Sequence, residues 1–333
     1  MSEIIENWKN GNLAPPSWIQ IHPTLKCNLH CYFCDNPKEA NTSKEIPQKR
    51  LLQLIDEANE MKISSVIISG GGEPLIRKNV VMKMIRKIKR YGMNGCLLTN
   101  GALINSIDAK TLVKIKWDTI IFSLHASNPK LDNFIRGGKN AFERTINAIK
   151  KINFWKRKSH TSKPMLGMVM VITKDNYHDI ENILKLAKKL EIRQVNLKMV
   201  NEHPDLFITK RQLLTFHSKI ENVKKYAERE GINLIIEFSL KDVKNYTFNI
   251  CNGGKVQNLC KVPFTEMVVF ADGTVSQCCN FWRKENEFLD NVQNKTLKEI
   301  WYGEKFEKLR EKIVKNDLPY TCQKCTLDFK LKR

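Results

Sequence analysis

The sequence lacks any long apolar run. No stretch of about 18 consecutive apolar residues occurs, so a membrane-spanning helix is not expected in these 333 residues. The first residues also lack the apolar segment of a secretory signal, and they carry Glu3 and Glu6 instead. We therefore expect a cytoplasmic protein that does not contact membranes.

Internal repeats and low-complexity linkers are absent too, so we expect the domains of the chain to pack tightly against each other. Hydrophobic residues make up 42% of the chain and charged residues 27%. These proportions are ordinary for a soluble globular protein. A chain of this length can bury a large core, and it suggests one large domain and one small one.

Acidic residues are scarce relative to basic ones. The 35 Asp and Glu residues face 56 Lys and Arg residues, which gives a net charge of +21. Such a surface attracts phosphate polymers. However, the excess is mostly Lys along helical stretches such as 83–90 and 185–189, and no basic stretch is interleaved with aromatics. Nucleic-acid binding is therefore disfavoured, whereas an anionic substrate stays open.

The first two thirds of the chain alternate short β-rich runs with amphipathic helical stretches. Leu51, Leu54, Ile55 and Ala58 show the helical spacing, which indicates one apolar helix face. Six βα units predict an α/β fold with a parallel sheet, a partial (β/α)6 TIM barrel over residues 13–231. The expected strands are 18–22, 66–69, 95–99, 119–124, 166–172 and 195–199. A helix at about 210–230 and a strand at 233–238 follow.

The remaining segment, 232–333, is predicted to be a small α+β domain. Runs at 265–270 and 275–279 flank the turn residues Asp272 and Gly273, and this pattern is typical of a β-hairpin. An amphipathic helix follows, with Leu297, Ile300 and Trp301 on one side. A loop then carries Cys322 and Cys325.

Ten cysteines in a chain without an export signal do not indicate a disulfide framework. A reducing compartment favours metal ligation or redox chemistry. Three cysteines, Cys27, Cys31 and Cys34, lie within eight residues. Three thiolates in one loop can hold three corners of a 4Fe–4S cluster and leave the fourth iron open. A zinc site that uses His30 or His22 as the fourth ligand is the alternative.

The Cys-x3-Cys-x2-Cys spacing, with Phe33 before the last cysteine, resembles the signature of the radical S-adenosylmethionine (SAM) superfamily. The resemblance implies that SAM chelates the open iron and is cleaved to a 5′-deoxyadenosyl radical. It also implies a flavodoxin- or ferredoxin-type electron donor.

Further residues match the SAM-binding motifs of this superfamily. Gly71, Gly72 and Glu73 resemble the motif that receives the SAM amino group. Ser123 and Arg136 would contact the ribose and carboxylate of SAM by the same resemblance, and Phe33 would lie near its adenine. His125 is interpreted as a loop-packing residue.

Four of the late cysteines, Cys260, Cys278, Cys322 and Cys325, form an ordered set. Four thiolates suit a structural zinc site as well as a cluster. The region resembles the SPASM/twitch extension of radical SAM enzymes, with spacing close to that of the butirosin-pathway dehydrogenase of 2-deoxy-scyllo-inosamine. The resemblance implies a shorter, twitch-like form with one auxiliary 4Fe–4S cluster, and so two clusters in all.

The leading functional hypothesis is a radical SAM oxidoreductase. A hydrogen atom is taken from a small molecule or a peptide, and the auxiliary cluster accepts the second electron. An alternative is a radical epimerase that uses Cys279 as its hydrogen donor, although an inert cysteine is the commoner fate for residues such as Cys279 and Cys251. Cys96 is expected in the core. A hypothesis of another class is a non-catalytic zinc protein that binds nucleic acid.

Overall fold

The computed structural model describes residues 3–34, 36, 45–200, 203–237, 260–279 and 288–323. The chain forms two compact units. The first comprises Met1–Lys26, Glu39–Cys96 and Cys251–Arg333, and the second comprises Cys27–Lys38 and Leu97–Ile250. The division predicted from the sequence, at residues 231 and 232, follows the chain rather than these contacts and stays a prediction. Cys251 and Cys325 lie outside the described residues.

The strands of the first unit pair in parallel around β1 and antiparallel from β8 to β10. Their order is β10 (Asp290–Asn291), β9 (Thr274–Ser276), β8 (Glu266–Val269), β1 (Trp18–Ile21) and β2 (Ser65–Ile68). β1 is parallel to both β2 and β8. β8 and β9 form the predicted antiparallel hairpin, and Gly273 supplies the positive φ of its turn. The parallel pairing of β8 with β1 was not predicted.

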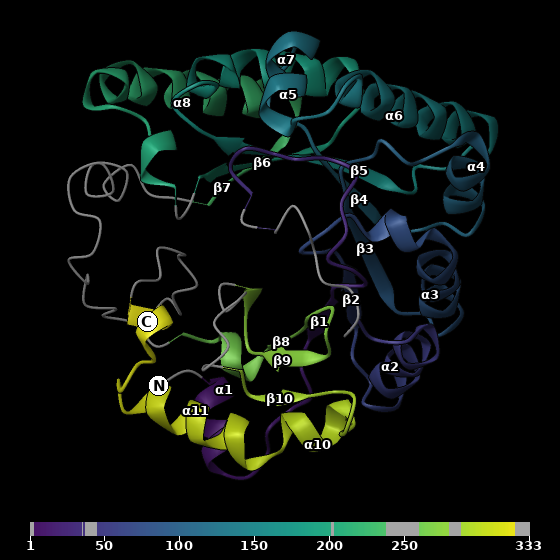
Figure 1. Cartoon of the computed structure of the whole chain (residues 1–333), viewed down its shortest axis with the longest axis vertical. Helices are drawn as coiled ribbons and strands as arrows, with labels where there is room; N and C mark the ends of the chain where they lie inside the picture. Colours follow the sequence, from purple (N-terminus) through teal and green to yellow (C-terminus); the bar gives the residue numbers. More distant parts are fainter. Residues whose placement is uncertain are drawn as a thin grey trace. The chain divides into compact units, whose positions relative to one another are not determined.

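Helices flank these strands (Figure 1). They are α1 (Glu3–Lys9), α2 (Gln48–Glu60), η1 (Pro74–Arg77), α3 (Lys78–Arg90), η4 (Val262–Phe264), α10 (Leu297–Trp301), α11 (Glu304–Val314) and α12 (Tyr320–Gln323). The predicted apolar face of α2 is buried. Trp8 of α1 donates a hydrogen bond to the Glu307 carboxylate of α11 at 2.8 Å, and Trp301 donates to the Ala14 carbonyl at 3.0 Å. These contacts tie the chain's first residues to its last helices.

The second unit is built on a fully parallel set of strands. β4 (Thr119–Ser123), β5 (Met165–Ile172), β6 (Gln194–Met199) and β7 (Asn233–Ile236) follow one another in sheet order as they do in the chain. β3 (Asn94–Thr99) begins in the first unit and ends in the second. The predicted α/β fold is confirmed.

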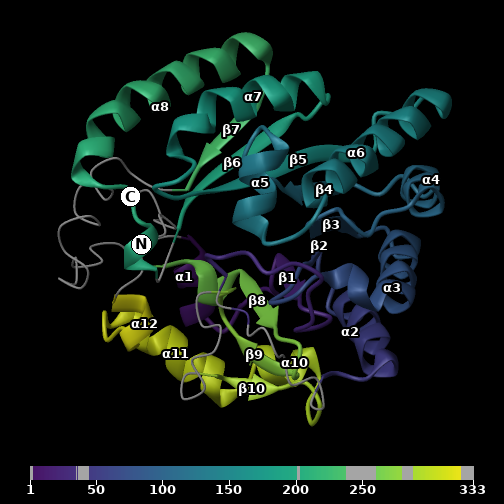
Figure 2. The ribbon, with the colours of Figure 1, turned by 45° about the horizontal axis from the view of Figure 1, so that its top comes forward.

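The helices of the second unit cover one face of its strands (Figures 1 and 2). They are α4 (Ser106–Lys114), α5 (Pro129–Arg136), α6 (Ala141–Lys158), η2 (Tyr177–Asp179), α7 (Ile180–Lys189), η3 (Pro204–Leu206) and α8 (Lys210–Glu230). A capping box of Thr209 and Gln212 starts α8, and Gly231 ends it in the left-handed conformation. These signals explain why this helix has the bounds that its sequence predicts.

The other face of these strands carries a row of residues set by the strand register. Ser123, Val169, Asn196 and Ile235 lie side by side in neighbouring strands. Val171 and Lys198 pair one step nearer the carboxyl ends. This face is therefore apolar along β5 and polar along β6.

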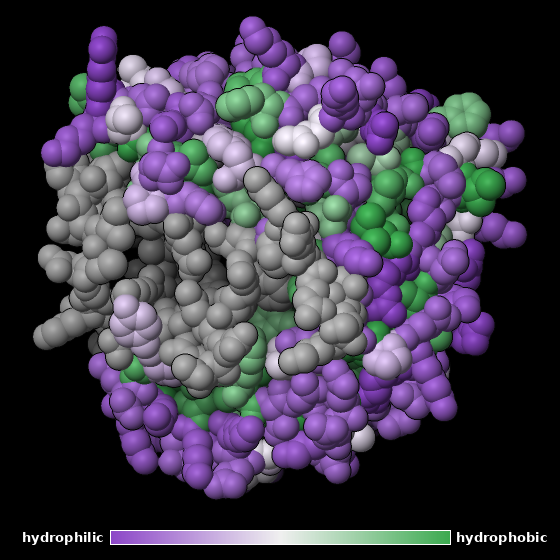
Figure 3. All heavy atoms as spheres, in the orientation of Figure 1, coloured by the Kyte–Doolittle hydropathy of each residue, from purple (hydrophilic) through white to green (hydrophobic). Residues whose placement is uncertain are grey.

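Hydrophilic residues dominate the described surface in the view of Figure 3, as the excess of Lys predicts. Among the residues that the structure describes, no helix is long and apolar enough to cross a membrane.

Trp301 tests the packing of the last helices. The side chain is fully buried, with its ring 5.1 Å from the Phe306 ring and 4.4 Å from the Arg310 guanidinium carbon. We expect Trp301→Ala to lower the free energy of unfolding by about 3–5 kcal/mol, because it removes a large core side chain. Tyr302→Ala, at the exposed neighbouring ring, should cost about 0.5 kcal/mol. Urea denaturation measures both free energies of unfolding, and equal losses would contradict the core position of Trp301.

Candidate functional site

The three early cysteines share one loop of the second unit. Cys27 and Cys31 are half-buried and Cys34 is exposed. Burial raises the pKa of Cys31 to about 12; the neighbouring thiols of Cys34 and Cys27 also raise it, and Arg136 opposes them. The three thiols are thus close enough to interact. A bound cationic centre would reverse this balance, because metal coordination deprotonates a thiol.

Within the described ranges, no three His, Cys, Asp or Glu side chains are grouped closely enough to hold one metal ion. Three thiols in one loop are the donors that a 4Fe–4S cluster with one open iron takes. The donor set therefore suits the predicted cluster.

The last turn of α5 docks the cysteine loop. The His30 N–H donates to the Arg136 carbonyl at 3.1 Å, and the Tyr32 N–H donates to the Ile135 carbonyl at 3.0 Å. Gly137 ends α5 at a φ of +58°, and a Cβ placed there would lie 2.4 Å from the His30 carbonyl oxygen. Glycine therefore permits the close approach of helix and loop.

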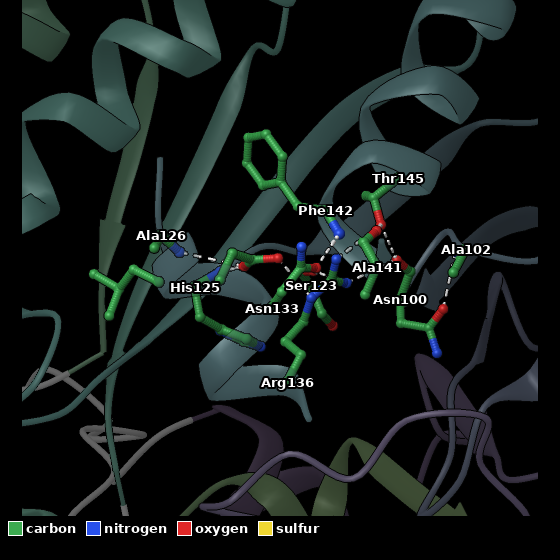
Figure 4. Close-up of polar contacts among 12 residues, drawn as sticks. Asn100, Ala102, Ser123, His125, Ala126, Asn133, Arg136, Ala141, Phe142 and Thr145 are labelled. Carbon is green, nitrogen blue, oxygen red and sulfur yellow. Dashed lines mark hydrogen bonds and ion pairs between the residues drawn. The ribbon is translucent and has the colours of Figure 1, made fainter. Parts of the chain in front are cut away.

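Arg136 is a fully buried anchor beneath that turn (Figure 4). Its Nε donates to the Asp132 carboxylate at 2.8 Å. Nη1 donates to the carbonyl oxygens of Asn100 at 3.1 Å and Ser123 at 2.9 Å, and Nη2 donates to Thr145 Oγ1 at 3.1 Å. The guanidinium thus ties the ends of β3 and β4 to α5 and α6. Its predicted contact with the SAM carboxylate stays a prediction.

Ser123 and His125 lie where β4 ends. Ser123 is half-buried on the strand face that the helices leave open. His125 is buried, and its Nδ1 accepts a hydrogen bond from the Val171 N–H at 3.1 Å. Its ring packs edge-to-face with the Phe33 ring, with 4.8 Å between the ring centroids. Burial, aided by Arg136, lowers the pKa of His125 to about 3. The ring is therefore neutral, which suits the packing role inferred from the sequence.

Aromatic residues fix the other end of the cysteine loop. The Tyr32 hydroxyl lies 2.7 Å from Thr173 Oγ1 and donates to the Asp175 carboxylate at 3.1 Å. Tyr32 and Phe33 pack against an apolar cluster formed by Val200, Leu206 and Phe207. The loop is thus held at both its backbone and its side chains. Proximity of Phe33 to adenine stays a prediction.

The glycine-rich turn after β2 belongs to the first unit. The Gly72 N–H donates to the Thr24 carbonyl at 3.1 Å, and the Glu73 N–H donates to the Lys26 carbonyl at 2.8 Å. A Cβ on Gly72 would lie 2.2 Å from that Lys26 oxygen. Glu73 Oε1 accepts from the Leu75 N–H and so caps η1. Binding of the SAM amino group by Gly71, Gly72 and Glu73 stays a prediction.

The late cysteines are described in part. Cys260, Cys278 and Cys322 are half-buried in the first unit, and Cys279 is exposed. The four-thiolate set that includes Cys325 therefore stays a prediction. Cys96, expected in the core, is half-buried on β3, and burial raises its pKa to about 12. Its thiol is therefore unreactive at neutral pH.

Sequence reasoning missed the polar residues that support the loop: Asn28, Asn100, Tyr32, Asp132, Thr145, Thr173 and Asn176. Asn176 Nδ2, for example, donates to the carbonyl oxygens of His125 and Val171, both at 2.8 Å. Their one sequence signal is position, since Asn100 and Thr173 directly follow strands β3 and β5.

Known proteins match this architecture. Residues 21–187 match the radical SAM superfamily, and residues 260–326 match the SPASM iron–sulfur cluster-binding domain. A Pyrococcus furiosus protein is 24% identical to this chain over an alignment of 334 residues. It is the tungsten-containing aldehyde ferredoxin oxidoreductase cofactor-modifying protein, and the alignment covers 93% of this chain and 87% of that protein.

Solved structures share the fold. SuiB of Streptococcus suis bound to S-adenosylmethionine has a TM-score of 0.70 at 20% identity, and the match covers 92% of this chain and 69% of SuiB. Native anSMEcpe with bound AdoMet has a TM-score of 0.66 at 18% identity, with 92% and 86% covered.

Gly137 and Gly231 offer a matched test of loop docking. Both glycines end helices at a positive φ, but a Cβ at Gly231 would meet no atom within 4 Å. Gly231→Ala should therefore show only the backbone cost, about 1–2 kcal/mol in the free energy of unfolding. Gly137→Ala should cost more and should also reduce iron uptake on anaerobic reconstitution, because it displaces His30. Denaturation curves and iron analysis decide, and equal behaviour of the two variants would refute the docking.

Proposed function

The chain belongs to the radical SAM superfamily, and on that premise we propose that it oxidises a substrate by two electrons after removing one hydrogen atom. A 4Fe–4S cluster bound by Cys27, Cys31 and Cys34 would supply the electron that cleaves SAM to the 5′-deoxyadenosyl radical, which abstracts the hydrogen. The observation that carries the proposal is the docked cysteine loop, in which three interacting thiols are held by α5 and by Tyr32.

The chain's own residues would orient the reaction. Ser123 stands on the open strand face beside Val169, where a bound nucleoside could reach its hydroxyl. His125 stays neutral and keeps Phe33 in place. The polar part of that strand face includes the ion pair of Lys198 with Glu237 at 2.8 Å. It also includes the hydrogen bond of 2.9 Å that Gln194 donates to Asn196. These groups support a polar substrate.

The second electron is assigned to the late cysteines. Cys260, Cys278, Cys322 and Cys325 would hold an auxiliary 4Fe–4S cluster with no open iron, which suits electron acceptance rather than substrate binding. The group held by these cysteines would supply an acceptor for the electron that the oxidised substrate loses, and the proton would pass to solvent. The match to a cluster-binding domain over residues 260–326 supports this assignment.

A peptide or a small molecule is the proposed substrate class. SuiB was solved bound to the precursor peptide SuiA, and anSMEcpe was solved with AdoMet and the Cp18Cys peptide. These relatives share the fold and support the peptide, whereas the tungsten cofactor-modifying relative supports the small molecule. An acidic flavodoxin or ferredoxin suits the net charge of +21 as electron donor.

Cysteine substitutions test the cluster assignment. The reconstituted protein should contain about eight irons per chain, and a triple Cys27, Cys31, Cys34→Ala variant should retain about four. That variant should lose all 5′-deoxyadenosine formation with SAM and dithionite. Cys278→Ala should keep SAM cleavage, because the SAM-binding iron is held elsewhere. Colourless protein with stoichiometric zinc would overturn the proposal.

Product analysis in deuterated water distinguishes oxidation from epimerisation. Oxidation predicts a product lighter by two hydrogens, with no solvent deuterium at the target carbon. Cys279 is exposed and could return a hydrogen atom to the substrate radical. An epimerase therefore predicts a product with the formula of the substrate, in which one hydrogen is replaced by solvent deuterium. If the reaction is the oxidation, Cys279→Ser should leave turnover unchanged. Deuterium incorporation by the wild-type protein, together with loss of turnover in Cys279→Ser, would favour the epimerase.

A further inference from the structure

Asn100 is held in one orientation by contacts on both its backbone and its side chain. It directly follows β3 and is buried. Its carbonyl oxygen accepts hydrogen bonds from Arg136 Nη1 at 3.1 Å and from Thr145 Oγ1 at 2.6 Å. Its side-chain Oδ1 accepts from the Ala102 N–H at 2.9 Å. Because that backbone group can only donate, the amide cannot be flipped, and Nδ2 must face the other way.

Nδ2 faces the start of the cysteine loop. It donates to Asn28 Oδ1 at 2.9 Å and lies 4.0 Å from Cys27 Sγ. The Leu29 N–H approaches the same sulfur at 3.5 Å. The amide has two hydrogens, so one can serve each neighbour. Cys27 Sγ thus receives two N–H donors, one from its own loop and one from the end of β3.

We propose that Asn100 is a positioning residue that donates an N–H···S hydrogen bond to Cys27 and so raises the reduction potential of the cluster which this cysteine helps to bind. The inference rests on the proposed function. Reduction adds negative charge to the cluster and its thiolates, and a donor aimed at a thiolate stabilises the reduced form more than the oxidised form. A less negative potential eases delivery of the electron by the donor protein.

The contacts around Asn100 argue for tuning rather than packing alone. A residue needed only to accept from Ala102 could be Asp, which has the same shape and the same acceptor. The amide adds a donor on the side where Cys27 lies. Arg136 and Thr145 fix the backbone from which that donor projects, so its aim does not depend on a bound cluster.

Two variants test whether the hydrogen-bond donor of Asn100 matters or only the shape of its side chain. Asn100→Asp keeps the acceptor and removes the donor, and Asn100→Leu removes the donor without adding charge. Asn28→Ala removes the other partner of the amide but leaves the N–H···S contact, and the exposed Asn147→Leu on α6 serves as a remote control. Circular dichroism and iron content confirm that each protein folds and loads.

The readout is the midpoint potential of the cluster whose EPR signal changes on addition of SAM, since that change identifies the open iron. We expect both Asn100 variants to lower the ratio of reduced to oxidised cluster at a fixed potential by about tenfold, or about 59 mV for one electron. Asn28→Ala and Asn147→Leu should leave it unchanged. An unchanged potential in either Asn100 variant that folds and loads overturns the inference.

Wild-type protein gives a second measurement in case both variants fail to fold. With 15N-labelled Asn, pulsed EPR of the reduced cluster should show a nitrogen coupling and an exchangeable proton at Cys27. Absence of the nitrogen coupling would refute the role of Asn100, because the Leu29 N–H by itself supplies an exchangeable proton at the same sulfur. Failure of the proposed function looks different, because the SAM-sensitive EPR signal would then be missing from every protein.

Discussion

The buried pair of Arg136 and Asp132 is the interaction on which the site depends. Both side chains are fully buried, and their charges meet at 2.8 Å. Burial raises the pKa of Asp132, while Arg136 and the N–H groups of His125 and Ala126 oppose that shift. A buried pair stabilises a protein only when its remaining hydrogen-bonding groups also have partners. Here the partners are carbonyl groups at the ends of β3 and β4 and Thr145 of α6, so the hydrogen bonds of one guanidinium hold three elements together.

The same hydrogen-bond network also fixes the cysteine loop. The Arg136 carbonyl receives His30, Asn100 reaches Cys27, and Asp132 fixes His125. From His125 the network continues through Asn176 to Thr173, whose hydroxyl meets Tyr32 in the loop again. The hydrogen-bond network therefore contacts the cysteine loop near both of its ends. Such a chain is strong only if every member is satisfied, which explains why its polar side chains are buried in a set.

The sequence predicted the elements well and the network hardly at all. A short β-rich run predicts a strand at 166–172, and β5 is observed at Met165–Ile172. A long helical stretch predicts a helix at about 210–230, and α8 is observed at Lys210–Glu230. Both signals are local, because each lies within the element itself. The pairing of β8 with β1 joins residues 266 and 18, and no local pattern encodes it. Asn100 and Thr173 show no periodicity either, since their partners come from distant segments. The cysteine motif was visible because its three cysteines share one short loop.

The loop's geometry follows from backbone contacts on both sides of its cysteines. Before Cys27, the turn at Gly72 and Glu73 fixes Lys26 by a hydrogen bond to its carbonyl. After Cys27, the end of α5 fixes His30 and Tyr32. Gly72 and Gly137 serve these two contacts, and in each a Cβ would meet a carbonyl oxygen within 2.4 Å. These contacts order the backbone of the loop, so part of the entropy of ordering it is lost on folding. A cluster bound by only three thiolates would require such a frame, because a fourth protein ligand would not be there to fix it.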